Sequence, residues 1–295
     1  MRLPGPLVDA DWLAANITSV EIADVRWSIP TGPKFDSFDE GHLPGAVFVD
    51  LDADLSDPPG PRGRHPLPPV DRFRRTISAL GLGRRPTICY DDSSGATAAR
   101  LWWMLDAIGH PVAVLDGGLA TWTGPIEAGT GTFFERPTSD PATIGDPSVD
   151  DWPRQRVIEV EEISEHVGGG SALLDARSAE RFRGEPNPVD PVAGHIPGGR
   201  SRPWTDNIDE GGIFRTPDQL RRELTALGLD GRREWLASCG SGVTACHNLL
   251  AARIAGLGDG RLYAGSWSEW ISDPSRPVEV GAAPAVTPPD NGGVA

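Results

Sequence analysis

The sequence predicts an α/β protein built from two similar domains, each a mainly parallel sheet flanked by helices. Three observations support this fold class. The chain has 295 residues, which is long enough for two hydrophobic cores. Its second half repeats motifs of its first half in the same order. Within each half, short apolar runs alternate with stretches of helical periodicity, as expected of strands joined by helices.

The internal repeat sets the size of the domain. Five motifs recur at offsets of 147 to 153 residues, so the repeating unit is roughly 150 residues long. We therefore expect a duplicated domain. The pairs are Asp24-Val25-Arg26 with Asp175-Ala176-Arg177, Gly41-His42-Leu43-Pro44-Gly45 with Gly194-His195-Ile196-Pro197-Gly198, Ala79-Leu80-Gly81-Leu82 with Ala226-Leu227-Gly228-Leu229, Gly95-Ala96-Thr97-Ala98 with Gly242-Val243-Thr244-Ala245, and residues 117–122 with 265–270.

The elements of the first unit follow from its apolar pattern. Residues 86–90 and 112–115 are short apolar runs that predict buried strands, whereas 70–80 and 97–108 have helical periodicity. Alternating elements of this kind favour a parallel sheet, because parallel strands need a crossover connection. Ligands of such sheets bind at the carboxyl ends of the strands.

The composition of the chain also predicts where the domains end. We expect a first domain over residues 1–125 and a second over 157–279. Residues 126–156 are rich in Pro, Gly, Thr and Asp and are predicted to be a linker that wraps one domain against the other. Residues 280–295 are mostly Pro, Gly and Ala, which predicts a disordered tail.

Charge and cysteine content exclude several classes of function. The chain carries 42 acidic and 27 basic residues, a formal net charge of −15, which argues against nucleic-acid or anionic-membrane partners. It lacks both a signal-like N-terminus and an apolar stretch of about 18 residues. Three scattered cysteines, Cys89, Cys239 and Cys246, suit neither a disulfide framework nor a zinc site. We expect a cytoplasmic protein without a metal or organic cofactor.

Cys239 is the strongest candidate for a catalytic group. It follows an apolar run over residues 234–238 and precedes a helical stretch over 245–255, so it occupies a strand-to-helix turn. Gly240 and Gly242 allow the turn to curl with its N–H groups pointing inward, and the helix adds the positive end of its dipole. Such a loop binds anions and favours a thiolate. The alternative is a half-buried structural cysteine at a helix start.

The repeat indicates one active site per chain. At the offset of 147 residues, Cys239 corresponds to Asp92 in the first unit, so the thiol is present only in the second. The first domain is then expected to cover the site and to contribute residues to it.

Taken together, these motifs resemble those of the tandem-domain rhodanese-type sulfurtransferases. The resemblance spans nearly the whole of residues 7–277. Thiosulfate-type members tend to have basic residues directly after the cysteine, whereas Gly240 and Ser241 stand there in this chain, as in the 3-mercaptopyruvate type. The motifs that carry the resemblance are the paired Gly-His-Leu/Ile-Pro-Gly segments, Trp102-Trp103-Met104-Leu105, Leu115-Asp116-Gly117-Gly118-Leu119, Gly265-Ser266-Trp267-Ser268-Glu269-Trp270, and Cys239 to Ala245.

The resemblance implies a two-step sulfur transfer. Cys239 would take sulfur from a small anionic donor, 3-mercaptopyruvate or thiosulfate, as a persulfide, and a thiol, thioredoxin or cyanide acceptor would remove it. The substrate-binding loop would consist of Gly240, Gly242, Val243 and Thr244, whose N–H groups would stabilise the persulfide.

The resemblance also implies how the proton is handled. In the 3-mercaptopyruvate type a Ser-His-Asp set has been proposed for this role, and the matching residues are Ser241, His65 and Asp52. His65 and Asp52 belong to the first domain. For His65 alone, the alternative is a histidine of a surface loop.

Binding of the donor carboxylate is the point at which the chain departs from the family pattern. Arg181 matches one family arginine, but Val189 stands where a second is expected. We expect either compensation by another arginine or a different physiological donor. The candidates for compensation are Arg183, Arg200 and Arg202.

The remaining motif residues are predicted to be structural. His42 and His195 recur at equivalent positions although only one unit has the cysteine, so we expect them to hold loops. Asp24 with Arg26, and the equivalent pair in the second unit, are expected to form buried ion pairs at strand ends. Cys89 and Cys246 are predicted core residues, with a resolving thiol as the alternative role of Cys246.

Three other functions compete with a mercaptopyruvate sulfurtransferase. The first is a sulfurtransferase that prefers thiosulfate, and the second is a non-catalytic sulfur carrier or binding module, which the missing arginine at Val189 would favour. The third is a cysteine phosphatase of the same domain type. That class needs an arginine six residues after the cysteine, where this chain has Ala245, so the phosphatase is nearly excluded.

Overall fold

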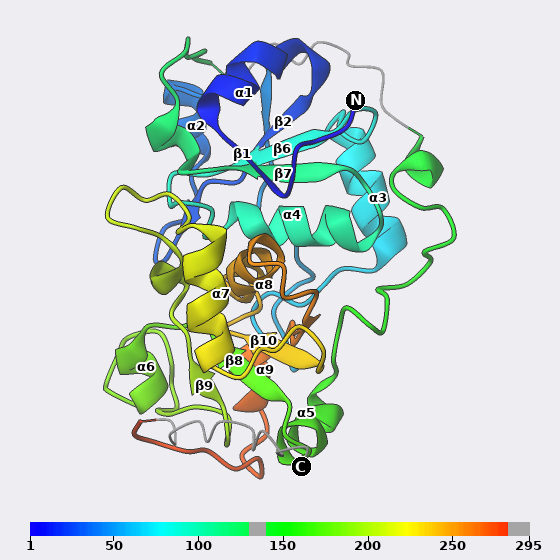
Figure 1. Ribbon diagram of the computed structural model, residues 1–295. Coiled ribbons are helices and arrows are strands. Elements are labelled where there is room, and N and C mark those ends of the chain that lie inside the picture. The colour runs from blue at the N-terminus through cyan, green and yellow to red at the C-terminus, as the bar shows by residue number, and fades with distance from the viewer. Residues whose placement is uncertain (130–139, 283–295) are drawn as a thin grey trace.

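The computed structural model describes residues 1–129 and 140–282 and contains two parallel sheets, one in each half of the chain (Figure 1). The first sheet has the order β1-β7-β6-β2-β5, and every neighbouring pair in it is parallel. Its strands are β1 (Leu7–Val8), β7 (Val112–Leu115), β6 (Thr87–Tyr90), β2 (Glu21–Asp24) and β5 (Ala46–Phe48).

The second sheet repeats this arrangement. Its order is β11-β10-β8-β9, again all parallel, and a parallel bridge from Val157 to Leu262 extends the β11 edge as β1 extends the β7 edge of the first sheet. The predicted α/β fold of two similar, mainly parallel units is therefore confirmed. The strands are β11 (Arg261–Leu262), β10 (Trp235–Ser238), β8 (Ala172–Asp175) and β9 (Arg200–Ser201).

The central strands are buried along their whole length and are mostly apolar, because helices cover both faces of each sheet. All four residues of β6, and all four of β10, are buried. This is the reason for their continuous apolar runs in place of an alternating pattern. A two-stranded antiparallel ribbon, β3 (Trp27–Ser28) with β4 (Gly32–Pro33), is added to the first domain.

Helices lie between the strands in both halves of the chain. Helix α7 shows why they begin where they do. Its N-cap, Thr216, forms a capping box with Gln219, and Pro217 occupies the first helical position. The helices are α1 (Ala10–Asn16), α2 (Phe35–Glu40), α3 (Val70–Ala79), α4 (Ala98–Ala107), α5 (Val160–Gly168), α6 (Ala179–Arg183), α7 (Pro217–Ala226), α8 (Ala245–Ile254) and α9 (Ser266–Trp270). No helix in residues 1–129 and 140–282 is long and apolar enough to cross a bilayer.

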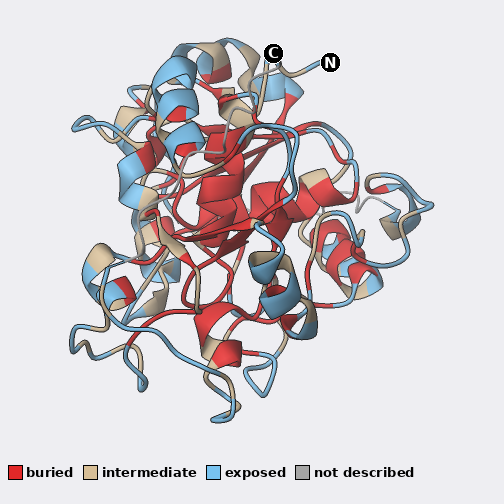
Figure 2. Ribbon diagram, turned by 60° about the horizontal axis from the view of Figure 1, so that its bottom comes forward, coloured by how far each residue is buried: buried red, intermediate tan, exposed pale blue. Residues whose placement is uncertain are grey.

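Helices α4 and α8 form the centre of the contact between the two halves. They pack against each other in the middle of the molecule, between the two sheets (Figure 1), and nearly all their residues are buried (Figure 2). A single hydrophobic cluster runs through both halves as a result. The loops that precede α4 and α8 are thereby brought to the same interface.

The described part of the predicted linker packs onto the domains. The side chains of Ile144 and Trp152 are buried in the shared core. The guanidinium of Arg74 donates to the Ile144 carbonyl, and the indole of Trp152 donates to the Pro68 carbonyl. Residues 130–139 of the linker and 283–295 of the predicted tail lie outside the described residues, and the domain bounds stay predictions.

Candidate active site

Cys239 is the first residue after β10, in the loop that leads into α8, as the sequence predicts. Its side chain is buried, with 2 % of its surface exposed. Gly242 is required for the loop's shape, because it has φ = +75° and a Cβ there would overlap the carbonyl of Ala264. The loop therefore curls tightly under the start of α9.

The start of α9 holds this loop in place. The amides of Trp267 and Ser268 donate to the carbonyls of Cys239 and Gly240, each at 3.0 Å. The amide of Cys239 in turn donates to the hydroxyl of Ser266. With its carbonyls turned toward α9, the loop directs the amide of Ser241 at the cysteine, 3.5 Å from Sγ. Gly240 lies between Cys239 and Ser241 in the loop.

The rest of the predicted binding loop continues into α8. Val243 is buried and Thr244 is the N-cap residue of the helix, so both have the positions that the sequence predicts. The sulfur of Cys239 therefore lies at the N-terminal end of α8, where the helix dipole favours negative charge.

Ser241, His65 and Asp52 form a continuous hydrogen-bonded chain across the domain interface. His65 Nδ1 lies 2.8 Å from the Ser241 hydroxyl, and His65 Nε2 lies 3.0 Å from Asp52 Oδ1. Because a carboxylate accepts, we assign the ring proton to Nε2, which leaves Nδ1 to accept the Ser241 hydroxyl proton. The structure thus brings together three side chains that are up to 189 residues apart in the sequence.

His65 is neutral at pH 7. The pKa of its imidazole is lowered to about 4, first by burial and then by the positive charges of Arg100 and Arg64, whereas Asp52 acts in the opposite direction. A neutral imidazole can accept a proton, which is what the predicted role requires. Trp27 also belongs to this group, although the sequence did not reveal it. Its indole donates to Asp52 Oδ2, and its ring meets His65 edge-on.

Arg100 lies beneath the cysteine loop and was not expected from the sequence. This α4 side chain is fully buried. Its guanidinium donates to three carbonyls, that of Gly242 in the cysteine loop and those of Leu55 and His65 in the first domain. It forms no ion pair with a carboxylate among the described residues. The sequence signal that could have identified Arg100 is a single arginine in a mostly apolar helical stretch.

Arg100 therefore has two effects on the site. Its hydrogen bonds join the loop that bears the cysteine to the segment that bears His65. Burial lowers the pKa of its guanidinium, while the neighbouring thiols of Cys246 and Cys239 act in the opposite direction. By the same coupling, the positive charge of Arg100 opposes the rise in the pKa of the Cys246 thiol.

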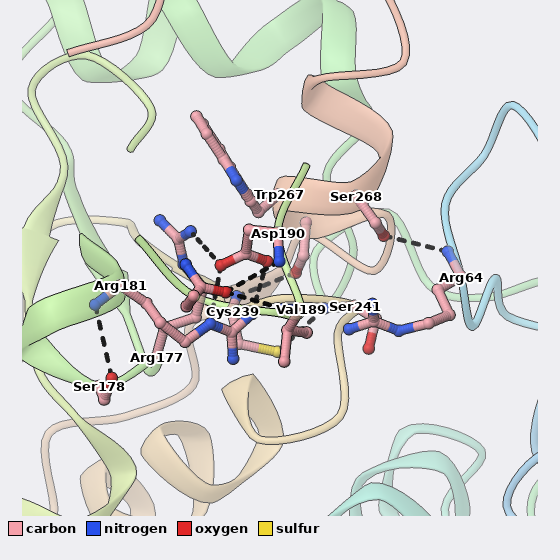
Figure 3. A network of polar contacts seen from close by, with 12 residues as sticks. Arg64, Arg177, Ser178, Arg181, Val189, Asp190, Cys239, Ser241, Trp267 and Ser268 are labelled. Atoms are coloured by element: carbon pink, nitrogen blue, oxygen red, sulfur yellow. Dashed lines mark hydrogen bonds and ion pairs between the residues drawn. The ribbon is translucent and has the colours of Figure 1, made fainter. Parts of the chain in front are cut away.

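Arg181 reaches the loop but is already paired. Its Nε and Nη2 atoms donate to the two carboxylate oxygens of Asp190, at 2.7 and 2.6 Å. Val189, the neighbour of Asp190, lines a cavity of 560 Å³ together with Asp52, His65 and Arg64. Figure 3 shows Arg64, Arg181, Val189 and Asp190 around Cys239.

The three arginines expected to compensate for Val189 have other partners. Arg183 binds Glu185 at the surface, Arg200 donates to the carbonyl of Leu227, and Arg202 binds Glu223 and the Asn207 side chain. Compensation for Val189 by one of these three arginines therefore stays a prediction.

The first domain contains an equivalent loop, and the structure corrects its alignment. The carbonyl of Asp91 accepts the amide of Leu119, just as the carbonyl of Cys239 accepts that of Trp267. Cys239 therefore corresponds to Asp91 and not to Asp92. The constant offset of 147 residues misled the sequence comparison, because the first loop has one more residue between its strand and its helix than the second.

The carboxylate of Asp91 fills its own loop. It accepts hydrogen bonds from the amides of Ser93, Gly95, Thr97 and Ala98, and from the Thr97 hydroxyl. Asp92 instead points outward and binds Lys34 at 2.7 Å. The loop between β6 and α4 thus binds the carboxylate of its own first residue, Asp91.

The predictions for the structural residues are confirmed. His42 and His195 are buried, stack on Phe38 and Phe182, and each bonds through Nδ1 to the carbonyl of that phenylalanine. The duplicated strand-end ion pairs form as well, Asp24 with Arg26 and Asp175 with Arg177.

The other two cysteines lie in the core. Burial raises the pKa of the Cys246 thiol to about 12, and it raises that of Cys89 as well. Both side chains are fully buried. A thiol with so high a pKa is a poor nucleophile at neutral pH, so Cys246 suits packing better than a resolving role.

The fold and the site define a class: a duplicated α/β protein with one cysteine in an anion-binding loop at the domain interface. The rhodanese-like domain family matches residues 9–124 and 159–273. The chain belongs to the rhodanese family.

Relatives of known sequence agree with this assignment. The chain is 44 % identical to a probable 3-mercaptopyruvate sulfurtransferase of Pseudomonas aeruginosa, covering 93 % of this chain and 98 % of that one. It is 40 % identical to a putative thiosulfate sulfurtransferase of Mycobacterium tuberculosis, covering 94 % and 98 %. The solved 3-mercaptopyruvate sulfurtransferase of Leishmania major superposes with a TM-score of 0.80 at 32 % identity, over 93 % of this chain and 76 % of that one. The predicted enzyme class, a sulfurtransferase, is confirmed.

Proposed function

We propose that the protein transfers sulfur from 3-mercaptopyruvate to a thiol acceptor through a persulfide on Cys239. The observation that carries this proposal is the hydrogen-bonded chain from Ser241 through His65 to Asp52, which reaches the residue two positions after the cysteine. A donor that leaves as an enolate needs a group that moves a proton. A donor such as thiosulfate does not.

The first half-reaction balances without an external oxidant. The Cys239 thiolate attacks the donor sulfur, a sulfur–sulfur bond forms, and the carbon–sulfur bond breaks with its electron pair going to the enolate of pyruvate. Neutral His65 accepts the donor's thiol proton through Ser241 and returns it to the enolate carbon. The products are the persulfide and pyruvate.

The loop stabilises the charge that this step creates. The terminal sulfur of the persulfide is anionic, and the amide of Ser241 together with the N-terminal end of α8 faces it. The buried guanidinium of Arg100 adds a positive charge below the loop. In the second half-reaction an acceptor thiolate, for example that of thioredoxin, or cyanide attacks the terminal sulfur and releases the Cys239 thiolate.

We also propose a cytoplasmic location. All three cysteines are unpaired. Free thiols together with a catalytic thiolate suit a reducing compartment.

Thiosulfate is the second candidate donor. It is favoured by the 40 % identity to the Mycobacterium tuberculosis relative, which is named for thiosulfate. Gly240 and Ser241, which follow the cysteine, argue against it, because neither residue carries a charge for a dianionic donor. A pure sulfur carrier would form the persulfide but release it to one protein acceptor only.

The first experiment compares the two donors on wild type, Cys239→Ser and Cys246→Ser. We expect turnover to be faster with 3-mercaptopyruvate, to vanish in Cys239→Ser and to persist in Cys246→Ser. Mass spectrometry of the wild type after one donor equivalent should show one added sulfur. Faster turnover with thiosulfate would contradict the proposed donor, and absence of the added sulfur with both donors would contradict the mechanism.

A His65→Gln variant tests the proton step separately. We expect kcat with 3-mercaptopyruvate to fall by about 10²–10⁴-fold, the usual contribution of a general acid or base. Turnover with thiosulfate should change little, because that donor leaves as sulfite and transfers no proton. An equal loss with both donors would mean that His65 only holds the interface together.

A further inference from the structure

The arginines of the second domain at the site are neutralised by their own neighbours. Arg177 pairs with Asp175 and also reaches Asp190 at 3.4 Å, while Arg181 binds Asp190 through two nitrogens. Asp190 is nearly buried, with 5 % of its side chain exposed. The positive charges of these two arginines are thus balanced by the negative charges of Asp175 and Asp190. Releasing Arg181 to bind a substrate would leave the buried carboxylate of Asp190 without this partner, which is costly.

Arg64 of the first domain has no such partner. No ion pair joins its guanidinium to a carboxylate of residues 1–129 or 140–282, and its Nε is buried without a hydrogen-bond partner. Its Nη2 lies 3.2 Å from the point that a Cβ on Gly240 would occupy, and Nη2 of Arg181 lies 3.0 Å from the same point. The two guanidinium groups therefore flank the residue next to Cys239 (Figure 3).

The backbone fixes Arg64 in this position. Its amide donates to the hydroxyl of Ser268 in α9 at 3.0 Å. Gly63 precedes it with φ = +99°, and a Cβ on Gly63 would contact the Gly265 carbonyl at 2.8 Å. This close approach of two backbones means that Arg64 is held against the same helix start that positions the cysteine loop. Its side chain then lines the cavity that also contains Val189.

We propose that Arg64 binds the carboxylate of the donor and so replaces the arginine that Val189 lacks. The ligand class is a small 2-keto carboxylate with a thiol on the neighbouring carbon, and the inference rests on the proposed function. A carboxylate beside Gly240 meets the unpaired guanidinium of Arg64, and the thiol of so small a donor then reaches the neighbouring Cys239. The carboxylate-binding charge of Arg64 therefore comes from the first domain, whereas the family pattern places the missing arginine at position 189 of the second domain.

The test compares Arg64→Gln with the matched control Arg62→Gln, two residues away and 65 % exposed. The donors are 3-mercaptopyruvate and mercaptoacetone, which has the same thiol and ketone but no carboxylate. For 3-mercaptopyruvate we expect KM to rise about 10- to 100-fold in Arg64→Gln, with kcat within a few-fold, as for loss of a charge-assisted hydrogen bond. With mercaptoacetone, kcat/KM should be unchanged. Arg62→Gln should behave as wild type with both.

A rescue variant adds to this test. In the double variant Arg64→Gln with Val189→Arg, the KM for 3-mercaptopyruvate should recover at least partly, because position 189 lines the same cavity. An equal loss on both donors in Arg64→Gln, or no change in the KM for 3-mercaptopyruvate, overturns the proposal.

Protection of Cys239 from iodoacetamide by pyruvate provides a readout that does not depend on turnover. We expect pyruvate to protect the wild type and Arg62→Gln, but Arg64→Gln much less. If protection depends on Arg64 while the wild type does not use 3-mercaptopyruvate, the carboxylate site is supported and the proposed function fails. If the wild type turns over and protection is independent of Arg64, the proposed function stands and the role of Arg64 is overturned.

Discussion

The loops that begin with Asp91 and Cys239 share one backbone design but contain different anions. Both follow the central strand of their sheet and precede a buried helix, α4 or α8. In the first loop the anion is built in, and the Asp91 carboxylate accepts four backbone amides. In the second, the first residue is a cysteine, so a negative charge is present only as a thiolate or a persulfide.

The difference explains why a duplicated chain has a single active site. The first loop is occupied by its own side chain and is structural, whereas the second contacts its sulfur through the Ser241 amide and leaves room for chemistry. The first loop is also an internal precedent, because it shows that a turn of this type satisfies an anion whose charged atoms lie three bonds beyond Cα.

Each loop is also contacted by the helix of the other domain. Arg100 of α4 donates to the carbonyl of Gly242, and His247 of α8, at the equivalent helix position, lies 3.1 Å from the carbonyl of Ser94. The first contact brings a charge to the cysteine loop. The second brings a neutral ring to the aspartate loop, because burial lowers the pKa of His247 to about 4. The positively charged Arg100 thus contacts the Cys239 loop, which has no carboxylate of its own.

The test with the largest expected effect introduces an aspartate, as found at position 91, at the first position of the second loop. We expect Cys239→Asp to abolish turnover, and to be more stable than Cys239→Ser by about 1–2 kcal/mol, because the carboxylate would accept the loop amides as Asp91 does. Urea unfolding at pH 7 measures the difference. A Cys239→Asp protein less stable than the serine variant would mean that the second loop is not preorganised for an anion.

Removing the built-in anion should destabilise the first domain. Asp91→Asn keeps one acceptor but loses several charge-assisted hydrogen bonds, so we expect the free energy of unfolding to fall by about 2–4 kcal/mol. The neighbouring Asp92→Asn is the control, since its partner Lys34 is partly exposed, and it should cost less than about 1 kcal/mol. Equal losses in the two variants would contradict the alignment of Cys239 with Asp91.

Arg100 tests how much the buried cation contributes to the reactivity of the cysteine. In Arg100→Met we expect iodoacetamide to alkylate Cys239 about 5- to 10-fold more slowly at pH 7, because the thiolate loses a neighbouring positive charge. Arg100→Lys keeps the charge and should lose at most about two-fold. Circular dichroism checks that both variants fold. If both variants react equally slowly, the hydrogen bonds of Arg100 matter and its charge does not.

The smallest effect concerns His247 and the pH dependence of stability. Its folded-state pKa of about 4 lies below the ordinary value of 6.5, so the unfolded chain binds more protons between these pH values. The free energy of unfolding therefore falls as the pH drops from 6.5 toward 4. His247→Gln should make this slope shallower by up to about 1.4 kcal/mol per pH unit, measured by urea unfolding at several pH values. An unchanged slope would show that folding does not lower the pKa of His247.

Prediction from the sequence succeeded where the signal is local. The apolar runs of the strands, the glycines around Cys239 and the repeated Gly-His-Ile-Pro-Gly motif each depend on nearby residues in the chain. Ser241, His65 and Asp52 came from a resemblance between motifs, and the structure places them within hydrogen-bonding distance of one another. The alignment with Asp92 failed, because a one-residue difference in loop length cannot be detected from a constant offset.

The sequence by itself determined the duplicated α/β fold, the position of the cysteine at a strand-to-helix turn and the absence of a second thiol at the equivalent loop. The tertiary structure decided which charges meet that cysteine. Arg100 reaches the cysteine loop because α4 packs on α8, Arg64 because its segment lies against α9, and Trp27 because its indole meets Asp52 and His65. Arg181 and Asp190 pair because their segments fold together. Apolar periodicity and turn chemistry operate over a few residues, whereas electrostatic interactions depend on distance in space and not on separation in the chain.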